Sequence, residues 1–286
     1  MIGGIWLIVF MPALSQPEDQ LMDDDQFRIL LEYLQYSWAG YRKVRKGAKK
    51  RIARHMDQLH CGNIAHYINL LDHRPDARQE CELRMTVSIS RFYRDRRLWE
   101  LLERQWLPEL IKKNPEKLKI WSAGCACGEE AYSFKIIYAQ LGQSYQFLPE
   151  LDLLATDIHP RYLERARHGR YGRSSLKELA PDLRQTCFDS RRSGRQYVIK
   201  DSLKDGIRWA HHHLGTDPPE TDFNIICLRN NILTYCRREA REKTLTAMVK
   251  GLVPGGLLII GCHEELPFQP ESLKPMPELP YVFRKW

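Results

Sequence analysis

The stretch that most constrains the fold is residues 117–134, where a short apolar run leads into a glycine loop and then a helix start. The run at 118–121 is mostly apolar, as in a buried strand. Gly124 and Gly128 bracket the loop, where glycine permits unusual backbone angles and lets a ligand lie against the main chain. The pattern predicts a strand, a tight loop and a helix that ends near residue 141.

The loop ends in two acids. Glu129 and Glu130 open the predicted helix, where negative charge suits the helix dipole. Two carboxylates repel a nucleotide phosphate and attract a cation, and S-adenosylmethionine carries both a sulfonium and an ammonium group. The loop has no G-x-G-x-x-G pattern and no Lys-Ser/Thr pair, which argues against NAD and ATP. An ordinary strand-to-helix turn is the alternative interpretation.

A second predicted strand, 151–157, ends in Asp157. An acid at this position of such a fold can accept hydrogen bonds from both ribose hydroxyls. Asp157 can alternatively cap a helix that begins near Pro160. The alternation of strands and helices from residue 117 onward predicts a largely parallel sheet with right-handed crossovers. The later strands are expected at 223–228, 257–261 and 281–283, with a helix at 238–252 closed by residues 254–256.

The first part of the chain has helical rather than strand-like spacing. A short antiparallel β insert is expected at 188–209, built from candidate strands 197–199 and 206–209. Residues 161–187 are predicted to be helical with an interruption at 169–172. The remaining helices are predicted at 24–40, 44–59, 64–71, 75–86 and 98–110.

The basic charge is local. The chain has 44 basic and 36 acidic residues, a net charge of +8, and residues 42–54 alone hold eight basic residues and no acid. The rest of the chain therefore has equal numbers of basic and acidic residues, 36 of each. This predicts a basic amphipathic helix that meets an acidic partner, with a merely solvated helix face as the alternative.

Neither a disulfide framework nor a metal site is indicated. The eight cysteines show no C-x-x-C spacing, and a chain of this length can build a core without crosslinks, so free thiols in a reducing cytoplasm are expected. The histidines at 211–213 are predicted to form a loop at a strand end. Residues 1–14 are apolar but too short to span a bilayer. We interpret them as a leader, a lipid-facing tag or a stretch ahead of a start at Met11 or Met22.

Four separated motifs, in order, resemble those of the chemotaxis receptor methyltransferase (CheR) family. They are Ser88-Ile-Ser-Arg-Phe-Tyr-Arg-Asp95, Trp121-Ser-Ala-Gly…Gly128-Glu-Glu-Ala-Tyr-Ser133, Ala155-Thr-Asp-Ile158 and Leu228-Arg-Asn-Asn-Ile-Leu-Thr-Tyr235. The resemblance implies a Rossmann-like, S-adenosylmethionine-dependent methyltransferase domain behind a small N-terminal helical domain. It implies methyl transfer to glutamate side chains of receptors. The expected division is a leader at 1–22, a helical domain at 23–95 and the methyltransferase domain at 96–286.

The resemblance also implies roles for individual residues. Glu129 would hold the cofactor's ammonium group, Asp157 its ribose, and Arg94 a carboxylate of the cofactor or of the acceptor. Tyr235 would line the methyl pocket, or else simply pack in the core. The other expected cofactor-binding residues are Ser88, Ser90, Gly124, His213, Leu214, Arg229 and Asn230. The chain departs from the family pattern at Cys125, Cys127, Ala131 and 231–235, and its insert lacks a glycine-rich loop.

The expected partner is an acidic, receptor-like protein docking on helix 42–54, with no nucleic acid, no metal and no stable membrane insertion. The chain is expected to act as a cytoplasmic monomer. Two alternatives are a methyltransferase on another acceptor and a non-catalytic S-adenosylmethionine-binding regulator. A nucleic-acid methyltransferase is disfavoured, because the strand end reads Arg229-Asn-Asn231 rather than the Asn/Asp-Pro-Pro-aromatic motif used on adenine.

Overall fold

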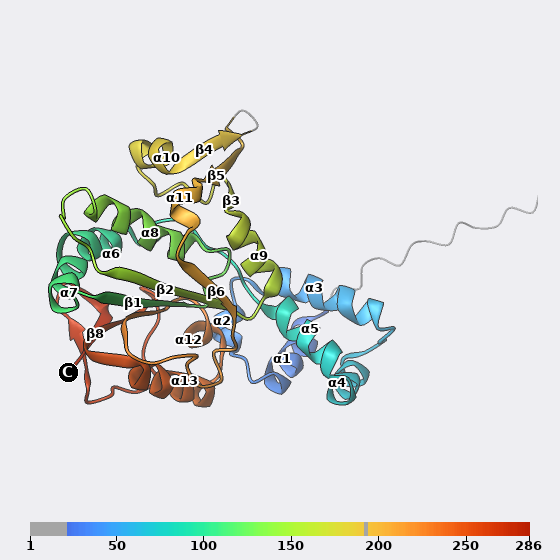
Figure 1. Cartoon of the computed structure of the whole chain (residues 1–286). Helices are drawn as coiled ribbons and strands as arrows, with labels where there is room; N and C mark the ends of the chain where they lie inside the picture. The colour runs from blue at the N-terminus through green and yellow to red at the C-terminus, as the bar shows by residue number, and fades with distance from the viewer. Residues whose placement is uncertain (1–21, 192–193) are drawn as a thin grey trace, which may run out of the picture.

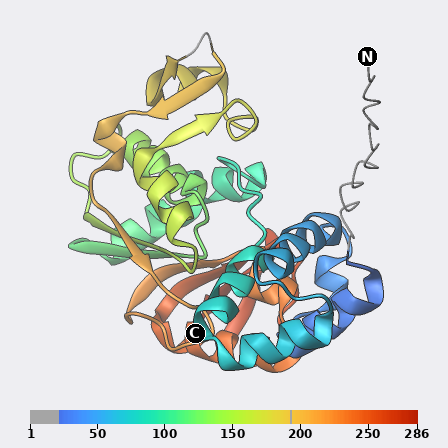
Figure 2. The ribbon, with the colours of Figure 1, turned by 90° about the vertical axis from the view of Figure 1, so that its right-hand side faces the viewer.

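The computed structural model describes residues 22–191 and 194–286. The proposed leader at 1–22 therefore lies, except for Met22, outside the described residues. A seven-stranded sheet forms the body of the molecule, and two smaller parts project from it, a group of N-terminal helices and a three-stranded sheet (Figures 1 and 2). The mixed α/β fold with N-terminal helices and a small antiparallel sheet is the predicted one.

The seven-stranded sheet has the order β6-β2-β1-β7-β8-β10-β9. Neighbours from β6 to β8 are parallel, and β10 runs antiparallel to both β8 and β9, so the sheet is largely parallel as predicted. The strands are β1 (Lys117–Ala123), β2 (Glu150–Asp157), β6 (Ile207–His211), β7 (Phe223–Leu228), β8 (Leu252–Ile260), β9 (Leu273–Met276) and β10 (Leu279–Lys285).

Helices cover both faces of this sheet (Figure 1). Ile120 and Trp121 are adjacent on β1 and pack into two different cores, one on each face. One face carries α6 (Arg96–Leu101), the π-helical segment Leu102–Trp106, α7 (Leu107–Lys113), α8 (Glu129–Leu141) and α9 (Pro160–His168), and the other carries α12 (Ile232–Tyr235) and α13 (Arg238–Gly251).

The N-terminal helices form a unit with its own apolar core. The predicted helix at 24–40 is wrong in extent, because the helix stops at Tyr33 and Gln35 has a positive φ of 58°. Residues 35–37 instead use their backbone groups in contacts with residues 235–237. The helices are α1 (Asp24–Tyr33), α2 (Trp38–Tyr41), α3 (Arg45–Gln58), α4 (Ile64–His73) and α5 (Pro75–Met85).

The small sheet differs from the prediction in its boundaries. Its strands are β3 (Arg170–Gly172), β4 (Phe188–Arg191) and β5 (Gln196–Ile199), paired antiparallel in the order β3-β5-β4, with α10 (Pro181–Cys187) inserted and α11 (Asp201–Lys204) following. The expected helix interruption at 169–172 is thus a strand. The expected insert strand at 206–209 belongs instead to β6 of the main sheet, where it pairs with β2. Residues 254–256, expected to close a helix, lie within β8.

Candidate active site

A cavity of about 340 Å³ opens at the carboxyl ends of β1, β2 and β7 and extends to the N-terminal helices. Its volume lies in the range of small-molecule sites, about 300–1,000 Å³. Among the predicted site residues, only Glu129 does not line it. Those that do are Ser88, Ser90, Arg94, Gly124, Asp157, His213, Leu214, Arg229, Asn230 and Tyr235.

Gly124 lines the cavity at a position where a side chain would not fit. Its φ is +82°, and a Cβ atom would lie 2.5 Å from Nδ2 of Asn231. The N–H groups of Gly124 and Cys125 both donate to the carbonyl of Thr156, at 2.8 Å each, which ties the loop after β1 to the end of β2. The glycine loop expected from the sequence is therefore bound to the neighbouring strand as well as to its own helix.

Asp157 ends β2 and faces the cavity. Its Oδ2 accepts a hydrogen bond from the N–H of Ala126 at 2.9 Å, and its Oδ1 accepts one from the N–H of His159 at 2.8 Å. Burial raises the pKa of this carboxyl, and the two N–H donors partly oppose that shift. The N-cap residue of α9 is His159 rather than Asp157, and the side chain of His159 makes no capping hydrogen bond.

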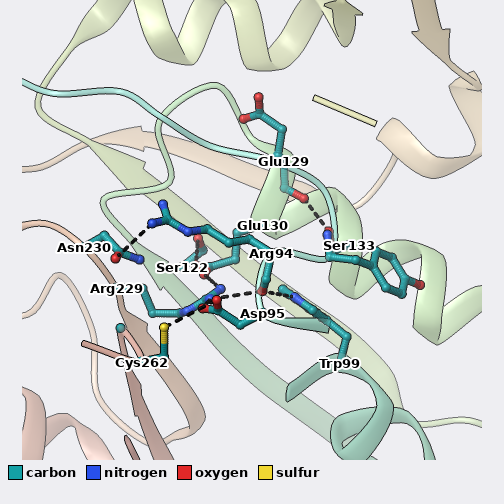
Figure 3. Close-up of polar contacts among 12 residues, drawn as sticks. Arg94, Asp95, Trp99, Ser122, Glu129, Glu130, Ser133, Arg229, Asn230 and Cys262 are labelled. Carbon is teal, nitrogen blue, oxygen red and sulfur yellow. Dashed lines mark hydrogen bonds and ion pairs between the residues drawn. The ribbon is translucent and has the colours of Figure 1, made fainter. Parts of the chain in front are cut away.

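The two adjacent glutamates have different environments (Figure 3). Glu129 is buried, accepts a 3.3 Å hydrogen bond from Ser175 on Oε1, and has no partner on Oε2. Burial raises the pKa of its carboxyl. Glu130 lines the cavity and accepts a 2.6 Å hydrogen bond from Ser122. The sequence analysis did not select Glu130, although it stands at the same helix start.

Arg229 lies at the end of β7 inside a buried ion-pair network (Figure 3). Its guanidinium contacts Oδ2 of Asp95 at 2.5 Å, Oε2 of Glu130 at 3.0 Å and the carbonyl of Arg94 at 3.1 Å. Burial opposes its charge, but the two carboxylates outweigh burial and raise its pKa. Arg229 therefore holds the segment at 94–95 against the end of the sheet.

Arg94 faces the cavity from this segment. Its guanidinium donates to the carbonyl of Ile89 at 2.9 Å and to Oδ1 of Asn230 at 3.3 Å. No acidic residue of the described chain pairs with it. Asn230 has a positive φ of 55°, as does Asp95 at 65°, so strained backbone gathers around the arginine.

His213 and Leu214 follow β6 at the far end of the cavity. Nδ1 of His213 accepts a 3.1 Å hydrogen bond from the N–H of Gly215, which turns the exposed ring toward its own loop. Cδ1 of Leu214 lies within 3.5 Å of the position of a Cβ on Gly124. His212, which the sequence analysis did not select, also lines the cavity and packs edge-on against Trp121.

Tyr235 closes the cavity on the side of the N-terminal helices. Its ring is half-buried and lies 5.0 Å from the ring of Tyr41, and burial raises its pKa. Glu264, which follows β8, accepts hydrogen bonds from the N–H of Asn230 at 2.9 Å and from Oγ1 of Thr234. The sequence analysis did not select Glu264, although its place after a buried parallel strand could have indicated a site residue.

The family model described as "CheR methyltransferase, SAM binding domain" matches residues 88–282, more than half of the chain. The chain belongs to the CheR methyltransferase family. The resemblance found from the four motifs is thereby confirmed, and this CheR family member is an S-adenosylmethionine-dependent methyltransferase.

Curated relatives agree with the family match. A chemotaxis protein methyltransferase of Listeria monocytogenes is 35% identical over 182 residues, which cover 64% of this chain and 67% of that protein. The chemotaxis protein methyltransferase Cher2 of Pseudomonas putida is 25% identical over 252 residues, covering 86% of this chain and 90% of the relative. The second match thus extends the similarity into the N-terminal helices.

The residues of this CheR family member fit S-adenosylmethionine. Glu129 does not line the cavity, but its buried, unpartnered Oε2 is suited to a cation, because an ammonium group would relieve the cost of leaving it unpaired. Asp157 faces the cavity with acceptor capacity remaining on both oxygens. Within the described ranges, no cluster of three histidine, cysteine or acidic residues is arranged to hold a metal ion. No helix there is long and apolar enough to cross a membrane.

Proposed function

We propose that the chain transfers a methyl group to the side-chain carboxylate of a glutamate in an acidic, receptor-like protein, with Arg94 holding the acceptor. The observation that carries this proposal is the guanidinium of Arg94, which faces the cofactor cavity and has no acidic partner in the described chain. A planar guanidinium can bind a carboxylate through two parallel hydrogen bonds. The names of the relatives, chemotaxis protein methyltransferases, support a receptor-like acceptor.

S-adenosylmethionine supplies an electrophilic methyl group on a sulfonium. The chain does not need a general base, because a glutamate with a reference pKa of ~4.3 is already ionised at neutral pH. Arg94 orients the acceptor carboxylate, and Asn230 and the carbonyl of Ile89 hold the guanidinium in place. Tyr235 and the N-terminal helices exclude water from that side of the cavity.

In this proposal the other predicted residues hold the cofactor. Glu129 binds the ammonium group and Asp157 the ribose hydroxyls. Ser88, Ser90, Gly124, His213, Leu214 and Asn230 shape the remaining wall, while Arg229 acts through the segment at 94–95.

We further propose that the acidic partner docks on part of the basic helix α3. Arg45 and Lys49 pair with Asp24, and Arg51 donates to the carbonyls of Arg84 and Thr86, so these three cations serve the helical unit itself. The exposed basic residues of the stretch at 42–54 are Arg42, Lys43, Lys46, Lys50 and Arg54.

A groove of about 670 Å³ beside α3 leads toward the cavity. Lys43, Lys46 and Arg161 line it, with Glu80 as the one acid, and residues 86–89 belong to both the groove and the cavity. An acidic segment lying in this groove would bring a glutamate to Ser88 and Arg94. We propose that the chain does this as a monomer in the cytoplasm.

The test is transfer of radiolabelled methyl from S-adenosylmethionine into a cell lysate, followed by mild alkali. Wild type is expected to produce labelled protein that releases volatile methanol. Arg94→Ala should abolish it, and the matched control Arg96→Ala, an exposed arginine two residues away, should not. Alkali-stable label, or label only in small molecules, would contradict the glutamate assignment.

A further inference from the structure

The loop that carries Asn230 and Tyr235 is held on one side by the N-terminal helical unit. The N–H of Ser37 donates to the carbonyl of Tyr235 at 2.7 Å, and the N–H of Arg237 donates to the carbonyl of Gln35 at 3.0 Å. Between these bonds, Tyr36 and Cys236 form an antiparallel bridge. The two segments therefore pair as a short two-stranded ribbon, although about 200 residues separate them in sequence.

Gly40 lets α2 lie directly against this loop. A Cβ atom at Gly40 would be 2.2 Å from the carbonyl oxygen of Thr234 and 3.0 Å from its carbonyl carbon. These neighbours are backbone atoms, so they cannot move aside as the end of a flexible side chain could. Gly40 has helical backbone angles, so the need for glycine here is steric and not conformational.

The loop has further anchors on the sheet side. Nδ2 of Asn231 donates to the carbonyl of Ala123 at 2.7 Å, and its Oδ1 caps α12. Glu264 binds the N–H of Asn230 and Oγ1 of Thr234. The loop is thus clamped between the carboxyl ends of β1 and β8 on one side and the N-terminal unit on the other.

We propose that residues 35–41 are a positioning element for methyl transfer, with Gly40 as the residue that allows the contact. This inference rests on the proposed function of the cavity. The segment itself acts through Tyr235, whose ring lies against Tyr41, and through the backbone of 234–237. The N-terminal unit then does more than bind a partner, because it completes the wall of the acceptor side of the cavity.

The test compares Gly40→Ala with Gly62→Ala. Gly62 lies in the same helical unit, has no positive φ, and a Cβ there would meet nothing within 4 Å. Alanine is the better helix former, so Gly40→Ala should not weaken α2 on its own. We expect Gly40→Ala to lower the maximal methyl-transfer rate at least tenfold, with the KM for S-adenosylmethionine and the calorimetric affinity for S-adenosylhomocysteine changed less than twofold. Gly62→Ala should match wild type in all three.

A second variant keeps the test independent of folding effects. Ser37→Pro removes the N–H donor to Tyr235, at a residue whose φ of −90° lies near the proline range and whose predecessor, Tyr36, is already in the extended bridge. It should lower the rate in the same direction without changing cofactor affinity. A rate within twofold of Gly62→Ala in both variants, or a parallel loss of rate and cofactor affinity, would overturn the proposal. The methyl-transfer rates of the variants are compared by the total label transferred. This comparison therefore holds even if the label of the wild type is alkali-stable and the glutamate assignment fails.

Discussion

Replacing Arg229 with methionine would test whether the buried ion-pair network organises the site. Methionine keeps much of the apolar stem but removes the charge, which leaves the carboxylates of Asp95 and Glu130 without their shared partner. The side chains of Arg229, Glu130 and Asp95 are 5%, 14% and 21% exposed. The three groups are therefore largely shielded from water, and the loss should be far larger than for a surface pair.

The magnitude follows from this burial. Removing one partner of a buried ion pair costs about 3–5 kcal/mol. Ser122 still donates to Glu130, and water reaches Asp95, so we expect about 3 kcal/mol, at the low end of that range. At roughly 2–4 °C per kcal/mol, the melting temperature should fall by roughly 6–12 °C.

Urea unfolding and differential scanning calorimetry at pH 7 measure this loss. The control is the triple variant Arg229→Met, Asp95→Asn, Glu130→Gln, which removes the stranded charges and should recover at least half of the lost stability. A loss below about 1 kcal/mol, the range of exposed ion pairs, or no recovery in the triple variant would refute the reasoning.

Three further predictions concern single carboxylates. Glu129→Gln should weaken S-adenosylhomocysteine binding by at least tenfold, since a hydrogen bond to a charged group contributes about 1.5–3 kcal/mol. Wild-type affinity should fall as the pH drops through the raised pKa of Glu129, because only the ionised form pairs with ammonium. Calorimetry at several pH values should show a smaller slope in the variant, in which Asp157 is the remaining proposed cofactor-binding carboxylate with a raised pKa. Glu264→Ala should lower the methyl-transfer rate while Glu264→Gln, which can still bond Asn230 and Thr234, largely restores it; equal loss in both would contradict a positioning role. Arg284 lowers the pKa of Glu109 to about 2, so their pair stabilises the fold above the unfolded-state pKa of ~4.3 and loses that effect as the pH falls toward 2. Glu109→Gln should therefore lower stability by about 1 kcal/mol at neutral pH, given partial exposure, and by nothing measurable in urea unfolding near pH 2.

The local sequence pattern was sufficient to predict the helices and strands that are buried along most of their length. The helix at 129–141 and the strands at 117–123 and 223–228 were predicted closely, because each is a periodic or continuous apolar segment buried in the main sheet. The place of Gly124 and Asp157 at neighbouring strand ends also followed from the sequence, since parallel strands bring their carboxyl ends to one edge.

Pairing between distant segments could not be found in this way. The short strand β3 was expected only as a break in a helix, because three residues have no periodicity, and pairing with β5 is what makes them a strand. The first helix was predicted seven residues too long, because the contacts of 35–37 with 235–237 override local helix propensity.

The sequence by itself determined the fold class, the family and most of the residues that line the cavity, since all of these depend on motifs that are short and local. Only the tertiary structure decided which partners each of those residues contacts. It directs Glu129 away from Arg229 and Glu130 toward it, and it pairs Arg229 with Asp95 while Arg94 lines the cavity with no acidic partner among the described residues (Figure 3). The physical reason is that the partners of a buried charge come from distant segments, and desolvation leaves few arrangements in which every charge is compensated.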